Sequence, residues 1–286
     1  MLQVEWKDKY LMNMNIFADV RKLCYKVTKA FFVLYNLKHS FDKGRHIIKK
    51  RMEKLPKDGI GNDLFIILNG PSLKRQDLSK LKGKHLMFVN RGFLHPLYKE
   101  LQPKYHVFVD PKLVSGVWPI EWIEQIFDMC PDIRIILPAQ WHGLKRFAKY
   151  KDDKRFFWLY WSIPCYINGV SSGCFSYAIL QGFNNIFFTG FDANSCAFDM
   201  IKSSESHFYG ADPELADMNS SQHISALYTT ALQLMDLQEF SKFCKKRNIN
   251  VYNLTDGGLL DMFIRRDFND PYNVEKEIQI PKGLLD

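Results

Sequence analysis

The sequence predicts an α/β fold in which helices cover both faces of a mostly parallel sheet. Short apolar runs recur from Leu64 onward, and polar segments with helical patterns lie between them. The runs are almost continuously β-branched or aromatic, which is typical of strands buried on both faces. With 286 residues, of which 47% are hydrophobic and 24% charged, the chain can bury one substantial core.

The expected elements alternate along the chain, as they do in proteins with a parallel sheet. The predicted strands are 64–68, 85–89, 105–109, 133–137, 156–160, 185–190 and 249–254. The predicted helices are 120–129, 141–150, 173–181 and 221–246. The polar segment at about 194–221 is longer than an ordinary connection, and we interpret it as a lid over a site.

The first sixty residues predict a basic, helical N-terminal appendage. The linker PKDGIGND at 56–63 separates this appendage, residues 1–60, from a main α/β domain at 61–286. Much of the formal net charge of +8 lies between Lys38 and Lys57, and apolar residues before this stretch recur at mixed three- and four-residue spacing. The pattern fits either a basic amphipathic helix on an anionic membrane surface or a solvated helix docked on the core.

Several classes of protein are not expected. The N-terminus is charged from the start and has no cleavage pattern, and the apolar run AFFVLY at 30–35 is far shorter than the roughly 20 residues of a spanning helix. The six cysteines form no C-x-x-C pair, which indicates reduced thiols in a cytoplasmic protein. The basic run lacks interleaved aromatic residues, so no nucleic acid partner is expected. The sequence leaves open whether the chain forms a homo-oligomer.

Small and polar residues end several predicted strands, which is where open α/β sheets bind ligands. These strand ends are Asn69-Gly70-Pro71-Ser72, Asn90, Asp110 and Gly190-Phe191-Asp192. Gly70 would let the backbone approach a phosphate, and a helix starting near Ser72 would point its N–H groups at that phosphate. The same residues also fit a plain strand-to-helix turn with Ser72 as the N-cap.

A second glycine motif, Ser171-Ser172-Gly173, directly precedes a predicted helix. Its hydroxyls and the free helix end could bind a carboxylate or a phosphate, or could only cap the helix.

His207 is the candidate general base. It lies in the segment SHFYG within the predicted lid, and an unperturbed histidine titrates near pH 6.5, which suits proton abstraction from a hydroxyl at neutral pH. His223 is a rival candidate, and a merely solvated histidine is the alternative to both. Metal chemistry is not expected, because the histidines form no H-x-x-x-H pair and Asp192 with Asp199 is too small a set for a metal site.

Taken in order, six segments resemble the bacterial sialyltransferases of glycosyltransferase family 42: LNGPSL, FVNRGF, FVDPKL, VSSGCFSYAILQGFNNIFFTGFD, AFDM and SHFYG. The resemblance covers about 64–263. It implies a Rossmann-like catalytic domain whose lid closes over a CMP-sugar donor, with no further cofactor. The implied reaction is metal-independent, inverting transfer of sialic acid, or a related acidic sugar such as Kdo, to a hydroxyl of a surface glycan of the lipopolysaccharide or capsule kind.

The resemblance also implies roles for the site residues. Asn69, Gly70, Ser72 and Asn90 would face the phosphate and ribose of CMP. Ser172 and Gly173 would hold the sugar carboxylate, Gly190 and Asp192 would lie near the cytidine, and His207 would deprotonate the acceptor. Pro71, Ser171 and Phe191 belong to the same motifs.

This chain departs from the family at two points. Asp110 stands where the family has an asparagine, and the two tyrosines that hold the leaving phosphate are missing, so that Tyr209 is a candidate substitute.

Two other functions stay open at this point. The Asn-Gly-Pro-Ser-Leu turn also resembles archaeal pterin pyrophosphokinase-like proteins, for which Asp110 and Asp192 would hold magnesium beside ATP. A non-catalytic relative that binds a nucleotide or glycan is the second alternative.

Overall fold

The computed structural model describes residues 20, 22–31, 34, 43–160, 169–194, 205–213 and 218–273. The chain divides into two compact units, Met1–Lys43 and Gly44–Asp286. In the first unit, residues 22–31 are helical. The division lies before the boundary that we expected between residues 60 and 61, because the helix that follows it packs into the core of the second unit.

The second unit is built on one eight-stranded sheet, and every strand pair in it is parallel. Its strands are β1 (Asp63–Ile67), β2 (His85–Val89), β3 (Tyr105–Val107), β4 (Arg134–Pro138), β5 (Phe156–Leu159), β6 (Asn185–Thr189), β7 (Asn250–Asn253) and β8 (Ile264–Arg265). The expected Rossmann-like α/β fold is confirmed. Of these strands, only the two-residue β8 was not expected from the sequence.

The helices of this unit are α2 (Lys43–Glu53), α3 (Tyr98–Leu101), α4 (Lys112–Ser115), α5 (Trp122–Met129), α6 (Val170–Gln181) and α8 (Ser220–Lys246). Short 3-10 helices complete the connections: η1 (Pro71–Arg75), η2 (Leu78–Leu81), η3 (Asn90–Leu94), η4 (Ala139–Trp141) and η5 (Lys145–Tyr150). The expected helix at 141–150 is therefore wrong, since that segment is covered by parts of η4 and η5.

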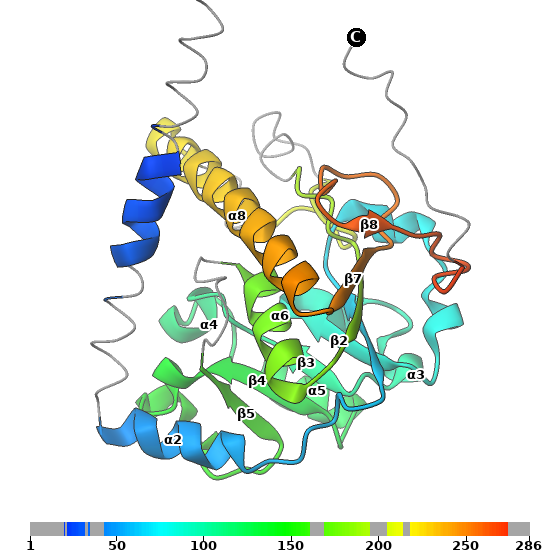
Figure 1. Ribbon diagram of the computed structural model, residues 1–286. Helices are drawn as coiled ribbons and strands as arrows, with labels where there is room; N and C mark the ends of the chain where they lie inside the picture. The colour runs from blue at the N-terminus through cyan, green and yellow to red at the C-terminus, as the bar shows by residue number, and fades with distance from the viewer. Residues whose placement is uncertain are drawn as a thin grey trace, which may run out of the picture. The chain divides into compact units, whose positions relative to one another are not determined.

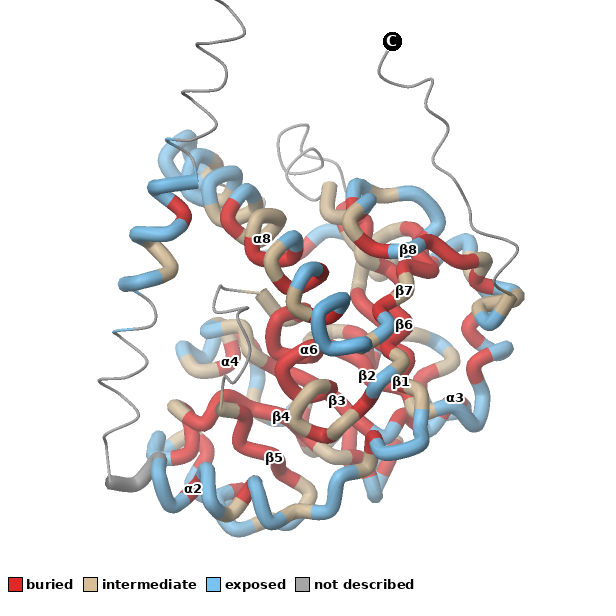
Figure 2. Tube along the Cα trace, in the orientation of Figure 1, coloured by how far each residue is buried: buried red, intermediate tan, exposed pale blue. Residues whose placement is uncertain are grey.

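The strand order β5-β4-β3-β2-β1-β6-β7-β8 reverses direction between β1 and β6. Because parallel crossovers are right-handed, the connections before and after this reversal lie on opposite faces of the sheet. Figure 1 shows α6 and α8 together on the near face. With both faces covered, the central strands are buried almost throughout, as Figure 2 shows.

The basic helix α2 is docked on the core of its own unit. Ile48 and Met52 are buried in that core, and the backbone N–H of Trp158 donates to Met52 Sδ at 3.2 Å. Arg51 pairs with Asp152 at 3.3 Å. For residues 43–53, therefore, the docked-helix alternative holds. None of the described helices is long and apolar enough to cross a membrane.

Candidate functional site

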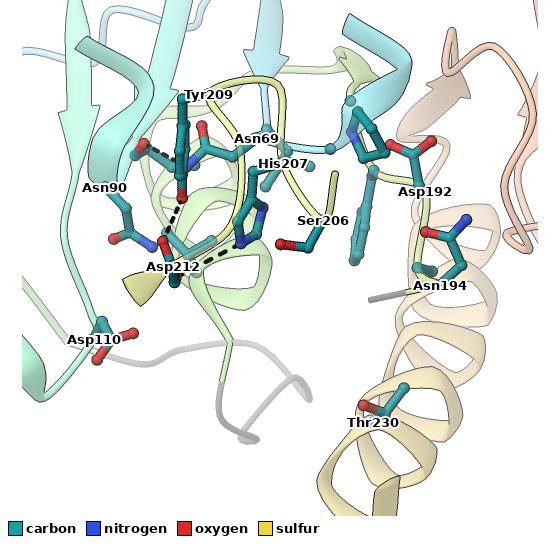
Figure 3. A pocket seen from close by; sticks show the side chains of 18 of the residues that line it. Asn69, Asn90, Asp110, Asp192, Asn194, Ser206, His207, Tyr209, Asp212 and Thr230 are labelled. Atoms are coloured by element: carbon teal, nitrogen blue, oxygen red, sulfur yellow. Dashed lines mark hydrogen bonds and ion pairs between the residues drawn. The ribbon is translucent and has the colours of Figure 1, made fainter. Parts of the chain in front are cut away.

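A cavity of about 340 Å³ opens where the strand order reverses, at the carboxyl ends of β1 and β6 (Figure 3). Open α/β sheets bind ligands at this position. Many of the residues expected at the site line it: Asn69, Gly70, Pro71, Asn90, Asp110, Gly190, Phe191, Asp192, His207 and Tyr209. Segments far apart in the sequence thus meet around one cavity.

The turns after β1 and β6 pack directly on each other. The Gly70 N–H donates to the Gly190 carbonyl at 2.8 Å. Gly190 has φ +68, and a Cβ atom there would lie 2.4 Å from the Leu68 carbonyl oxygen. A Cβ atom on Gly70 would lie 1.8 Å from Asp192 Oδ2. Neither position has room for a side chain, so the wall of the cavity here is bare backbone.

Ser72 lies behind this wall and does not line the cavity. Its Oγ donates to Asp192 Oδ2 at 2.9 Å, and the residue is fully buried. The helix that we expected to start near Ser72 is only the 3-10 turn η1, with Gly70 at its N-cap. Burial raises the pKa of Asp192, although the hydrogen bond from Ser72 acts in the opposite direction. Ser72 thus holds Asp192 in place.

Asn90 takes a left-handed conformation, with φ 47, at the end of β2. Its carbonyl bonds to His106 Nε2 at 2.8 Å, and His106 Nδ1 bonds to the Tyr98 hydroxyl at 2.9 Å. Burial lowers the pKa of His106 to about 3, so the ring is neutral at physiological pH and donates to the Asn90 carbonyl. A buried chain of hydrogen bonds therefore sets the position of Asn90.

Two carboxamide oxygens at the cavity, Asn69 Oδ1 and Asn90 Oδ1, are buried and have no hydrogen-bond partner among the described residues. Asn69 Nδ2 donates to the Val89 carbonyl at 3.2 Å, which identifies Oδ1 as the acceptor atom. Buried acceptors without partners are costly. A ligand that brought hydroxyl or amino donors would satisfy them.

The Ser-Ser-Gly motif lies in the first turn of α6 rather than on the cavity surface. Ser171 Oγ accepts a hydrogen bond from Gln233 Nε2 at 3.1 Å, and Ser172 is buried. A Cβ atom on Gly173 would lie 2.9 Å from Val109 Cγ1, which allows α6 to pack closely on the sheet. The neighbouring Val170 and Gln233 do line the cavity.

Within the expected lid at about 194–221, residues 205–213 include cavity-lining residues, whereas residues 220–221 already belong to α8. The N–H of His207 donates to the Gly210 carbonyl at 3.1 Å, and the N–H of Phe208 donates to the Asn69 carbonyl at 3.0 Å. Residues 195–204 and 214–217, and with them Asp199 and the segment AFDM, lie outside the described residues. The hairpin at 207–210 brings His207 and Tyr209 to the cavity.

Asp212 is the main site residue that sequence reasoning missed. His207 Nε2 lies 3.6 Å from Asp212 Oδ2, and the Tyr209 hydroxyl donates to Asp212 Oδ1 at 3.2 Å, as Figure 3 shows. Arg91 also forms an ion pair with Oδ1, and Lys112 Nζ lies 3.8 Å from Oδ2. Burial raises the pKa of Asp212, but its neighbours His207, Arg91 and Lys112 outweigh this effect, so the pKa is lowered.

Asp110 lines the cavity but turns toward the backbone, because its Oδ1 accepts a hydrogen bond from the N–H of Lys112 at 2.9 Å.

Within the part of the chain that the structure describes, no three His, Cys, Asp or Glu side chains are grouped to hold a metal ion. The described cysteines, Cys24, Cys130, Cys174 and Cys244, are free. Cys165 and Cys196 lie outside the described residues.

The fold and the cavity define a Rossmann-like α/β protein with a cavity, lined in part by polar side chains, at the reversal of strand order. No protein-family model matches the chain, and no curated protein matches it in sequence. Among solved structures, the chain is similar to the monofunctional alpha-2,3-sialyltransferase Cst-I from Campylobacter jejuni. The identity is 16% and the TM-score 0.38, over 82% of this chain and 90% of that chain. At these values the likeness carries no functional argument, so function rests on the site.

Proposed function

We propose that this chain is an inverting, metal-independent glycosyltransferase that moves sialic acid, or a related acidic sugar such as Kdo, from its CMP ester to a glycan hydroxyl. One observation carries the proposal: His207, with Asp212 beside it, lies at the same cavity as the strand-end residues of β1, β2 and β6. The CMP-sugar donor class is drawn from the six ordered segments that resemble glycosyltransferase family 42.

The proposed chemistry requires few groups. His207 takes the proton of the acceptor hydroxyl while that oxygen forms a bond to the anomeric carbon, and the bond from this carbon to the CMP phosphate breaks with its electron pair leaving on the phosphate. The transition state is a cationic sugar beside an anionic phosphate, which oriented neutral donors can stabilise. No covalent intermediate is needed.

Lys112 and Tyr209 are the candidates for holding the leaving phosphate in place of the family's tyrosines. Both line the cavity, and both have their polar ends beside Asp212. Asp110 also lines the cavity, and the hydrogen bond that its Oδ1 accepts from the backbone of Lys112 does not cancel the charge of a carboxylate. Lys112 is therefore also the candidate for offsetting Asp110 beside an anionic donor.

Nucleotide-dependent stabilisation tests the donor class. We expect CMP to raise the unfolding temperature without magnesium, and to do so more than UDP or ATP. A ligand at 100 times its Kd adds about 2.7 kcal/mol to the free energy of unfolding. Thermal unfolding with CMP, CDP, UDP and ATP, with and without magnesium, measures these shifts in unfolding temperature.

Mass spectrometry of reactions of CMP-sialate and CMP-Kdo with simple galactosides then identifies the sugar transferred. A magnesium-dependent preference for ATP would instead favour the pyrophosphokinase alternative.

We also propose that the helix of the first unit binds an anionic membrane surface peripherally, at the cytoplasmic face. Its exposed apolar residues recur at three- and four-residue spacing: Val20, Leu23, Val27, Phe31 and Leu34. Residues 20–34 contain four basic and no acidic residues. An apolar stripe with basic residues on the rest of the helix is the pattern of interfacial helices.

Vesicle binding tests this second proposal. We expect the full chain to sediment with phosphatidylglycerol vesicles and not with phosphatidylcholine vesicles, and Leu23→Asp with Phe31→Asp to abolish the binding. Ile47→Asp is the matched control, because Ile47 is equally exposed but lies on α2. A truncation should remove residues 1–42 only, since Ile48 and Met52 belong to the core. A full chain that stays in solution with both vesicles would contradict the proposal.

A further inference from the structure

We infer that Asp212 is the positioning residue of this site: it holds the His207 ring with Nε2 toward its carboxylate, so that Nδ1 is the atom that takes the acceptor proton. The inference rests on the proposed function. It assigns a role to Asp212, which lies in none of the six segments that resemble glycosyltransferase family 42.

The His207 ring is held at its edge and on its face. At the edge, Nε2 lies 3.6 Å from Asp212 Oδ2, a separation that commonly shortens when substrate binds. On the face, the Tyr209 ring stacks on it with centroids 4.9 Å apart and an angle of 29° between the planes. Tyr209 also donates its hydroxyl to Asp212. Nδ1 lies on the side of the ring away from Asp212 (Figure 3).

Asp212 itself is fixed from two other elements. Arg91, in η3, pairs with one carboxylate oxygen, and Lys112, in α4, lies near the other. The Arg91 guanidinium also lies over the rings of Trp118 and Trp122, at 5.5 and 5.3 Å from their centroids. The Asp212 side chain is only 8% exposed. The carboxylate that faces His207 is therefore anchored to the end of the sheet.

The charge on Asp212 decides which ring nitrogen carries the proton. An ionised carboxylate can only accept, so the neutral His207 ring must donate Nε2–H to it and keep its lone pair on Nδ1. When Nδ1 takes the acceptor proton, the imidazolium forms beside a carboxylate that stabilises it. Asp212 accepts throughout and takes no proton, since Arg91 and Lys112 favour its ionised form.

Nitrogen-15 NMR on the full chain with labelled histidine tests the inference directly. The His207 resonances are assigned as those missing from His207→Ala. We expect Nε2–H in the wild type and Nδ1–H in Asp212→Asn, because the asparagine amide can donate to Nε2. We also expect Asp212→Asn to lower kcat about 100-fold, a typical size for a general-base effect, with little change in donor KM.

Two further variants separate positioning from folding. Asp132→Asn makes the same change at an exposed carboxylate next to the amino end of β4, and it should leave kcat and the tautomer unchanged. Asp212→Glu keeps the charge and should keep the Nε2–H tautomer, with part of kcat recovered. If Asp212 only stabilised residues 205–213, the His207 tautomer would be the same in Asp212→Asn and Asp212→Glu.

The outcomes distinguish this inference from the function on which it rests. An Nδ1–H tautomer in the wild type overturns the inference. This measurement is made on the wild type, so it does not depend on whether the variants at position 212 fold. If Asp212→Asn keeps the kcat and the tautomer of the wild type while His207→Ala is inactive, the inference about Asp212 is overturned. The proposed transferase function then still stands. Unchanged turnover in His207→Ala overturns the proposed mechanism, while the tautomer of His207 can still be read.

Discussion

Replacement of His207 with alanine is expected to lower kcat for sugar transfer by about 10²- to 10⁴-fold, the usual contribution of a general base. CMP binding should change little, because the strand-end residues of β1, β2 and β6 remain in place around the cavity. The ring is not part of the buried core, so the variant should fold. Steady-state kinetics with CMP titration by calorimetry measures both quantities.

His223→Ala is the matched control, because His223 is the rival base and lies in the first turn of α8 without lining the cavity. It should keep wild-type turnover. If His223→Ala were inactive and His207→Ala active, the base would have to be reassigned to α8. A loss of CMP binding in His207→Ala would mean that the ring binds the donor rather than serving as the base.

Gly70→Ala is expected to abolish CMP binding and to lower the free energy of unfolding by about 1–3 kcal/mol, the usual range for overpacking. Gly70 has φ −63 and ψ 156, which any residue can adopt, so backbone strain is not the cause. The cause is space, because the new Cβ would lie 1.8 Å from Asp192 Oδ2 and 2.6 Å from the Gly190 carbonyl oxygen. Urea unfolding and CMP titration measure the two effects.

The neighbours of Gly70 cannot easily move. Asp192 is held by Ser72, and the Gly190 carbonyl accepts the Gly70 N–H. Gly143→Ala is the control, since a Cβ atom there has no neighbour within 4 Å and Gly143 is not among the glycines with positive φ. It should be neutral or slightly stabilising. Normal stability and CMP affinity in Gly70→Ala would show that β1 and β6 can separate without harm to the site.

Much of the sheet could be predicted because its central strands are buried on both faces and so appear as continuous apolar runs. β8 has only two residues, of which Ile264 is exposed, and so lacks this signal. In α2, the many lysines and arginines hid the pair Ile48 and Met52, whose four-residue spacing places them on one side of the helix.

The strand-end residues could be predicted as cavity residues because parallel strands present their carboxyl ends at one edge of the sheet. Local motifs did not show which way a serine faces: Ser72 and Ser171 bind neighbouring side chains instead of lining the cavity. The contact between Arg91 and Asp212 joins residues 121 positions apart, and no local pattern reveals such a pair. The nearest signal was position, since Arg91 lies in the quoted segment FVNRGF.

The pairing of β1 with β6 also sets when the cavity can first form during synthesis of the chain. Ser72 and Asp192 are 120 residues apart. At about 5–20 residues per second, a ribosome needs roughly 6–24 s to add that stretch. Throughout this interval β1 has no partner on its β6 side, and the nascent chain presents an open apolar strand edge on which other chains can pair. Nucleotide cannot assist folding before β6 emerges, so protection of this early intermediate falls to chaperones or to rapid translation.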